Sequence, residues 1–297
     1  MPRDREGGGP GPGPGSGGGP GPIPDIGPGR GPGPGPGLGD GDGTETLLFP
    51  NPFGGFSADG SEYVIRLRWL DGEGHLLPPR PWVNVVANER AGFLVSERGA
   101  GFTWSGNSRE HRLTPWSNDT VTDPHDEALY LRDDESGRIW SPLPGPAPLP
   151  AGYEVRHGFG SSRFTVAGEG LVHETALFVP PEDPVKVVRL RLRNPGSRPR
   201  RLTAVWYARL VLGVLPEETA ASVQIETGPG VVRARNPEER GYEEAVAFVA
   251  APGGDVLATD RGSFLGAAGE MARPEALRRG DVGSDPDDGG NREDGGD

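Results

Sequence analysis

Apolar and polar side chains alternate along much of the chain between residues 63 and 259, and a period of two is typical of β-strands. In residues 63–69, aromatic and aliphatic side chains fall on one face, and Arg66 and Arg68 fall on the other. Residues 185–193 repeat the pattern, with Val and Leu alternating with arginine. The pattern therefore predicts a series of strands that bury one face.

Short strands of this kind recur with turn signals between them. We predict strands at residues 63–69, 83–87, 92–96, 128–132, 138–140, 153–157, 162–166, 171–179, 185–193, 201–214, 223–226, 231–235, 245–250 and 256–259. Only residues 273–280 show a helix pattern, with Pro274 near the start and Gly280 just past the end. Without alternating strands and helices, we expect an all-β fold, either a sandwich or a barrel.

Composition divides the chain into three parts. From Gly7 to Gly43, 29 of 37 residues are Gly or Pro, so residues 1–43 are predicted to be a disordered linker. Residues 280–297 contain seven acidic residues against one arginine and are predicted to be a disordered acidic tail. The foldable domain is therefore expected at residues 44–279.

Charge and cysteine content exclude several classes of function. The net charge of −13 argues against a nucleic-acid partner. The absence of cysteine excludes disulfides, thiolate metal sites and cysteine nucleophiles. Neither a signal peptide nor an apolar run of the ~20 residues that a membrane span needs is visible, so we expect a cytoplasmic protein without a membrane span.

The usual catalytic motifs do not point to an active site. The chain has no Gly-x-Ser-x-Gly nucleophile motif and no phosphate-binding loop. His125 lies beside Asp123, Asp126 and Glu127, which we interpret as a solvated acidic turn in preference to a metal site, so no metal is predicted. Six carboxylates could supply an acid and a base, but surface solvation is favoured and no catalytic residue is assigned. They are Asp119, Asp123, Asp126, Glu127, Glu169 and Glu174.

Residues 101–119 form a loop that is rich in aromatic and polar side chains. Its aromatic members offer flat faces on which the C–H face of a sugar can stack, and its polar members can orient hydroxyl groups. The aromatic residues are Phe102, Trp104 and Trp116, and the polar residues are Asn107, Arg109, Asn118 and Asp119. The alternative, weighted equally, is that the tryptophans anchor the core and the polar residues cap turns.

Motifs in series resemble the N-terminal domain of glycoside hydrolase family 94, formerly glycosyltransferase family 36. The resemblance covers about residues 50–280. It is closest to the phosphorylase-like module of cyclic β-1,2-glucan synthases and to β-1,2-oligoglucan phosphorylases. It rests on residues 51–65 (NPFGGFSADGSEYVI), 81–88 (PWVNVVAN), 92–97 (GFLVSE), 102–104 (FTW), 107–110 (NSRE), 113–119 (LTPWSND), 130–133 (YLRD), 140–142 (WSP), 156–158 (RHG), 162–164 (SRF), 178–180 (FVP), 183–186 (DPVK), 234–236 (ARN) and 260–266 (DRGSFLG).

The resemblance implies a large antiparallel β-sandwich, a supersandwich of the galactose-mutarotase-like type, joined to an (α/α)6 barrel. The barrel carries the catalytic acid, and inorganic phosphate acts as co-substrate of the full-length enzyme without a further cofactor. Loops of the sandwich shape the active site, often across a dimer, which points to Arg156, His157, Arg163 and the 104–119 loop. The sequence departs from the family pattern at His111 and just before Ser162.

These observations favour a non-catalytic sandwich domain of a glycoside phosphorylase or glucan synthase that contacts a β-linked glucan or gluco-oligosaccharide. We expect it to pack on a separate or missing (α/α)6 domain, because the sequence ends where the barrel would begin, and to form a homodimer. Whether it is an enzyme is left open. One alternative is a purely structural or assembly module without sugar affinity, and a weaker one is an autonomous glycosidase.

Overall fold

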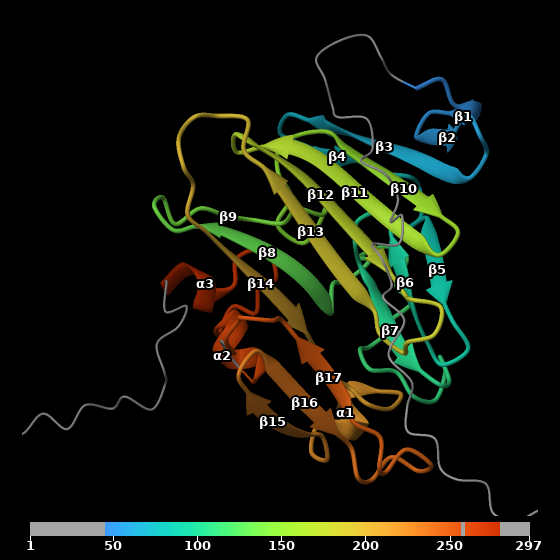
Figure 1. Cartoon of the computed structure of the whole chain (residues 1–297), viewed down its shortest axis with the longest axis vertical. Helices are drawn as coiled ribbons and strands as arrows, with labels where there is room; N and C mark the ends of the chain where they lie inside the picture. Colours follow the sequence, from blue (N-terminus) through green and yellow to red (C-terminus); the bar gives the residue numbers. More distant parts are fainter. Residues whose placement is uncertain (1–44, 257–258, 280–297) are drawn as a thin grey trace, which may run out of the picture. The chain divides into compact units, whose positions relative to one another are not determined.

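The computed structural model describes residues 45–256 and 259–279. The predicted linker and acidic tail, at residues 1–43 and 280–297, lie outside the described residues, as does part of the strand predicted at 256–259. Within the described ranges the chain forms four antiparallel sheets and three short helices, which confirms the all-β prediction (Figure 1). No helix in these ranges is long and apolar enough to cross a membrane.

The largest sheet, sheet A, has the strand order β1-β2-β3-β10-β11-β12-β13, and β4 pairs with β3. Every described pairing is antiparallel, and β10, β11, β12 and β13 lie side by side in Figure 1. The strands are β1 (Leu48–Asn51), β2 (Gly54–Phe56), β3 (Glu62–Leu70), β4 (Gly74–Leu76), β10 (Tyr153–Gly158), β11 (Ser161–Gly168), β12 (Leu171–Phe178) and β13 (Val187–Arg193).

Three smaller sheets complete the domain. Sheet C contains β5 (Val83–Ala87), β6 (Ala91–Ser96) and β7 (Gly101–Ser105). Sheet D has the order β14 (Leu202–Ala208), β8 (Glu127–Asp133) and β9 (Ile139–Trp140). Sheet E contains β15 (Gln224–Gly228), β16 (Val231–Arg235) and β17 (Ala247–Ala250), and the helices are α1 (Pro216–Thr219), α2 (Arg261–Leu265) and α3 (Glu275–Arg279).

The main core lies between the inner face of sheet A and the inner faces of sheets C and D. Ile65 and Phe164 of sheet A pack in one apolar cluster with Phe93 of sheet C and with Leu131 and Trp140 of sheet D. These side chains are fully or almost fully buried. Because side chains alternate across each strand, the opposite face of sheet A is left for the polar residues.

Strand β8 is buried on both faces. Leu129 and Leu131 join the main core, whereas Tyr130 belongs to a second cluster that includes Phe264 of α2 and Leu277 of α3. The Tyr130 hydroxyl donates to the carbonyl oxygen of Met271 at 2.7 Å. The C-terminal helices therefore cover the face of sheet D that sheet A does not.

Several boundaries differ from those expected. Residues 101–105, placed in a loop, form β7, and the long run predicted at 201–214 stops being a strand after Ala208. The expectation of a single helix was also wrong within the described residues, because α1 and α2 were missed. Helix α2 carried a recognisable signal: the side chain of its N-cap, Asp260, accepts a hydrogen bond from the backbone of Ser263.

Candidate functional site

The outer face of sheet C presents apolar and aromatic side chains. The register places Trp104 of β7 opposite Gly92 of β6, and Gly92 opposite Ala87 of β5. A Cβ atom on Gly92 would lie 2.4 Å from the Trp104 ring and 2.6 Å from the Ala87 methyl group. The indole therefore rests directly on the glycine, which only a residue without a side chain permits.

Two further aromatic rings extend this surface. The Phe102 ring lies 5.2 Å from the ring of Trp104 and 5.2 Å from that of Trp116, tilted by 36° and 31°. The Arg112 guanidinium sits 5.7 Å from the Phe102 centroid, within cation–π range. Phe102 is buried, whereas both tryptophans are half-buried.

The exposed end of this surface lies on β5, where Val83 is 44% and Val85 59% exposed. We call the whole surface the aromatic face. It comprises Val83, Val85, Phe102, Trp104, Arg112 and Trp116.

The polar residues predicted beside these rings are engaged in local turns. Asn107 Oδ1 accepts hydrogen bonds from the backbone of Arg109 at 2.8 Å and of Glu110 at 3.1 Å. Asp119 accepts from the Thr122 hydroxyl at 2.7 Å and from two backbone N–H groups, and these bonds lower its pKa. Asn118 has a positive φ of 52°, and Arg109 is exposed. Asn107 and Asp119 thus cap turns, as the alternative interpretation expected.

His111 is buried behind this loop. Its ring stacks on Tyr242 with centroids 4.0 Å apart and planes 4° apart, and its Nδ1 atom contacts the carbonyl oxygen of Ser105 at 3.1 Å. Burial lowers the pKa of His111. His111 therefore fixes the loop against the segment after β16 and does not reach the aromatic face.

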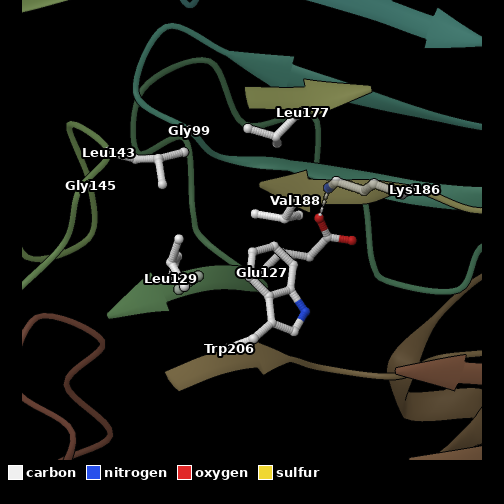
Figure 2. A pocket seen from close by; sticks show the side chains of 10 residues that line it. Gly99, Glu127, Leu129, Leu143, Gly145, Leu177, Lys186, Val188 and Trp206 are labelled. Atoms are coloured by element: carbon white, nitrogen blue, oxygen red, sulfur yellow. Dashed lines mark hydrogen bonds and ion pairs between the residues drawn. The ribbon is translucent and has the colours of Figure 1, made fainter. Parts of the chain in front are cut away.

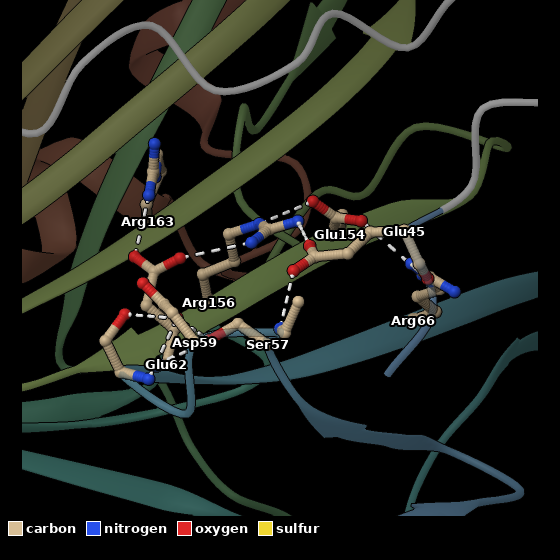
Figure 3. A network of polar contacts seen from close by, with 10 residues as sticks. Glu45, Ser57, Asp59, Glu62, Arg66, Glu154, Arg156 and Arg163 are labelled. Carbon is tan, nitrogen blue, oxygen red and sulfur yellow. Dashed lines mark hydrogen bonds and ion pairs between the residues drawn. The ribbon is translucent and has the colours of Figure 1, made fainter. Parts of the chain in front are cut away.

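Arg156 and Arg163 lie on the outer face of sheet A, within a network of ion pairs (Figure 3). Arg156 contacts Glu45 at 2.7 Å, Glu62 at 3.1 Å and Glu154 at 2.7 Å. Arg163 contacts Glu62 at 2.7 Å. We call these five residues the arginine network. Arg156 is almost fully buried, and each of its three guanidinium nitrogens contacts a carboxylate. Its guanidinium group is therefore already paired within the chain.

His157 points to the opposite face of β10 from Arg156, because neighbouring residues of a strand alternate. Its Nδ1 lies 3.0 Å from Ser162 Oγ, and its Nε2 lies 3.3 Å from the carbonyl oxygen of Trp82. Burial lowers the pKa of His157 to about 4, so the ring is neutral at neutral pH. Asn84 also bonds to Ser162 Oγ at 3.0 Å, so this group joins sheets A and C.

A buried ion pair lies deeper between the sheets. Figure 2 shows Lys186 and Glu127 pointing toward one another beside Trp206. Glu127 also accepts from Thr103 at 2.5 Å and from Thr114 at 2.7 Å. Burial raises the pKa of Glu127, but Lys186 and the hydroxyl groups outweigh this effect and leave it below the usual value. The adjoining cavity, of about 10 Å³, has room for one water molecule and excludes a sugar.

The solvated acidic turn predicted around His125 was wrong. Asp123, His125 and Glu127 are all buried: Asp123 and His125 pack against residues 96–98, and Glu127 lies on β8, which is covered on both faces. Asp123 accepts from Ser96 Oγ at 2.7 Å, and burial lowers the pKa of His125 to about 4. No group of three or more metal-binding side chains occurs in the part of the chain that the structure describes.

Glu97 is a buried carboxylate that the sequence interpretation missed. It is 1% exposed and accepts a hydrogen bond from the backbone of Trp82 at 2.8 Å. Burial raises the pKa of Glu97 to about 7. Glu97 ends the motif at residues 92–97, but nothing in that motif marks its side chain as buried, because the burial depends on the return of residues 81–82 over the end of β6.

The predicted site residues thus separate into three places. Trp104 and Trp116 lie on the aromatic face with the turn that carries Asn107 and Arg109 nearby, Arg156 and Arg163 lie on the outer face of sheet A, and His157 lies between sheets A and C. Among these places the aromatic face alone combines half-exposed rings with exposed apolar neighbours in the described residues.

Comparison with known proteins identifies relatives. Residues 61–291 match the family described as "Glycosyl hydrolase 94, supersandwich domain". The chain is 40% identical over 234 residues to the cyclic beta-(1,2)-glucan synthase NdvB of Rhizobium meliloti (strain 1021), which covers 77% of this chain and 8% of that protein. It is 30% identical over 158 residues to the N,N'-diacetylchitobiose phosphorylase of Vibrio furnissii, covering 52% of this chain and 19% of the relative. The chain therefore spans less than a fifth of these relatives.

Proposed function

The chain belongs to the glycosyl hydrolase 94 supersandwich family, and we propose that it is a non-catalytic domain that binds a β-linked glucan or gluco-oligosaccharide through the aromatic face. The observation that carries this proposal is the group of half-buried Trp104 and Trp116 rings beside exposed Val83 and Val85. The names of the relatives, a β-(1,2)-glucan synthase and disaccharide phosphorylases, support a sugar ligand.

Sugar stacking suits this surface for a physical reason. The axial C–H groups of a β-linked glucose form an apolar patch, and flat rings remove that patch from water without requiring hydrogen bonds at each contact. Trp104 is held rigid by Gly92 beneath it, so little side-chain entropy is lost on binding. Arg109, exposed on the neighbouring turn, supplies a donor for the hydroxyl rim.

In the complete system, the sandwich would act together with a catalytic (α/α)6 domain. That domain would carry the acid, and inorganic phosphate would be the co-substrate. We assign no catalytic residue to the present chain, and a homodimer and the cytoplasmic location stay predictions.

The proposal is tested by calorimetric titration of the purified chain with β-1,2-gluco-oligosaccharides. We expect binding in the millimolar range and a loss of about tenfold in affinity, or about 1.4 kcal/mol, for Trp104→Ala and for Trp116→Ala. Phe159→Ala is the matched control, because Phe159 is 95% exposed but lies on the β10–β11 turn. Circular dichroism would show whether each variant is folded.

A purely structural module is the second candidate, and the turn-capping bonds of Asn107 and Asp119 favour it. No heat at millimolar oligosaccharide, together with unfolding of both tryptophan variants, would establish that reading. Release of glucose 1-phosphate by this chain alone, in the presence of phosphate, would contradict a non-catalytic role.

A further inference from the structure

Strand β13 forms an edge of sheet A and carries a row of arginines. In the described residues it pairs with β12 alone. Arg189, Arg191 and Arg193 share the outer face of the sheet, while Val188 and Leu190 turn toward the core. Successive arginines are spaced about 6.6–6.8 Å apart, the two-residue repeat of a strand. We call these three residues the arginine stripe.

The stripe differs from the arginine network because, within the described residues, only Arg191 has an acidic partner, and that ion pair is long and exposed. Arg189 Nε is buried without a hydrogen-bond partner. Arg191 lies 3.8 Å from Glu174 and is 54% exposed, and Arg193 is exposed. Arg191 and Arg193 therefore present the charge of the stripe to solvent, whereas the Arg189 Nε atom is closed to it.

Positive charge continues beyond the stripe. Residues 189–201 contain six arginines and no acidic residue, although the whole chain carries a net charge of −13. Arg198 pairs with Glu135, and Arg200 pairs with Asp133. Arg201 is exposed, so the loop adds to the positive surface that the stripe begins.

The acidic C-terminal segment, residues 280–297, starts close to this surface. It follows α3, in which the carbonyl oxygen of Leu277 accepts from Arg132 Nε at 3.0 Å. Arg132 also pairs with Asp134, whose backbone N–H donates to the carbonyl oxygen of Arg201 at 3.1 Å. A segment of 18 residues can span up to about 60 Å, so its seven carboxylates can reach the stripe.

We propose that the arginine stripe binds the chain's own acidic C-terminal segment. Carboxylates placed along β13 would accept charge-assisted hydrogen bonds from the exposed guanidinium groups of Arg191 and Arg193. The contact would also cover an edge strand that otherwise offers its free backbone groups to another chain. Because the charges are largely exposed, the contact should weaken as salt rises.

A distance measurement between spin labels tests the proposal in the full chain, which has no cysteine of its own. Labels would be attached through Ala167→Cys, exposed on the outer face of β11 two strands from Arg193, and through Ser284→Cys in the segment. We expect a short, narrow distance distribution at low salt. We expect this population to be lost in about 0.5 M salt and in Arg191→Gln/Arg193→Gln.

The matched control is Arg233→Gln/Arg235→Gln, which removes two exposed arginines at the same spacing from β16 and should leave the short distance intact. A broad distance distribution in the parent chain, or the same change in distance in both double variants, would overturn the proposal. The arginines would then serve only to keep the exposed edge of sheet A from pairing with another strand. Loss of the short distance on dilution with unlabelled protein would also overturn it, because a second copy would then supply the segment.

Discussion

Residues of the aromatic face and of the arginine network were both predicted to contact a sugar, namely Trp104 and Trp116 in the first and Arg156 and Arg163 in the second. The structure surrounds these two pairs of side chains differently. Arg156 meets three carboxylates of its own chain, within 2.7–3.1 Å. Trp104 meets Gly92 on one side and remains partly exposed. A polar residue in a family motif can be fully used inside the domain, whereas the edge of an aromatic cluster leaves contact area for a ligand.

This difference predicts that the two groups of residues contribute to different properties, the arginine network to stability and the aromatic face to sugar binding. An ion-pair network that is buried and hydrogen-bonded costs free energy when one partner is removed, because the remaining charges lose their counter-ion. A half-exposed ring contributes to packing on one side and can be trimmed at lower cost. Substitutions in the arginine network should therefore affect unfolding, and substitutions on the aromatic face should affect sugar binding.

The largest effect is expected for Arg156→Leu. This change leaves Glu45, Glu62 and Glu154 close together without their shared counter-ion, so the free energy of unfolding should fall by about 3–5 kcal/mol. Urea denaturation followed by circular dichroism would measure it. Arg233→Leu, on the exposed face of β16, is the control and should change stability by less than about 0.5 kcal/mol. An Arg156→Leu chain that is as stable as the parent but no longer binds oligosaccharide would contradict this assignment and place Arg156 in the binding site.

Glu97 tests whether the interior tolerates charge. Its pKa of about 7 in the folded chain lies above the ordinary value of 4.5, so the folded state keeps this proton longer than the unfolded state does. Its contribution to stability is therefore complete below pH 4.5 and is lost as the pH rises through 7. Glu97→Gln removes the titration and should raise the free energy of unfolding at pH 8 by about 3 kcal/mol relative to the parent.

The measurement is the difference between the urea unfolding curves of Glu97→Gln and the parent from pH 5 to pH 8. Taking the difference cancels the contribution of the buried histidines to the pH dependence. Their lowered pKa values destabilise both chains alike as the pH falls below 6.5. A difference that does not change with pH would show that Glu97 titrates normally.

Alternation along the strands made most of the fold predictable from sequence. Strand β5 was predicted with its observed bounds, and β6 to within one residue. The same period of two places Arg156 and His157 on opposite faces, so their joint assignment to one site could have been avoided. The partnership of Glu127 with Lys186 could not be predicted, because 59 residues separate them and only the packing of three sheets brings them together.

Gly92→Ala should weaken sugar binding with a moderate loss of stability. The new methyl group would lie 2.4 Å from the Trp104 ring, so the indole must move off the sheet. We expect affinity for the oligosaccharide to fall about tenfold and stability by about 1–3 kcal/mol, the usual cost of overpacking. Gly152→Ala is the control, since its methyl group would meet only the Leu67 carbonyl oxygen at 3.4 Å. Equal affinity in both variants would remove Trp104 from the binding surface.

The smallest change is expected for Val85→Ser, which alters the aromatic face without touching the core. Val85 is 59% exposed, so the free energy of unfolding should change by less than about 0.5 kcal/mol. If a sugar covers this residue, losing its apolar contact should lower affinity by about 1 kcal/mol, or roughly fivefold, in a calorimetric titration. Val121→Ser, at a position 88% exposed and off sheet C, should leave affinity unchanged. The same affinity for Val85→Ser and the parent would restrict the binding surface to the tryptophans.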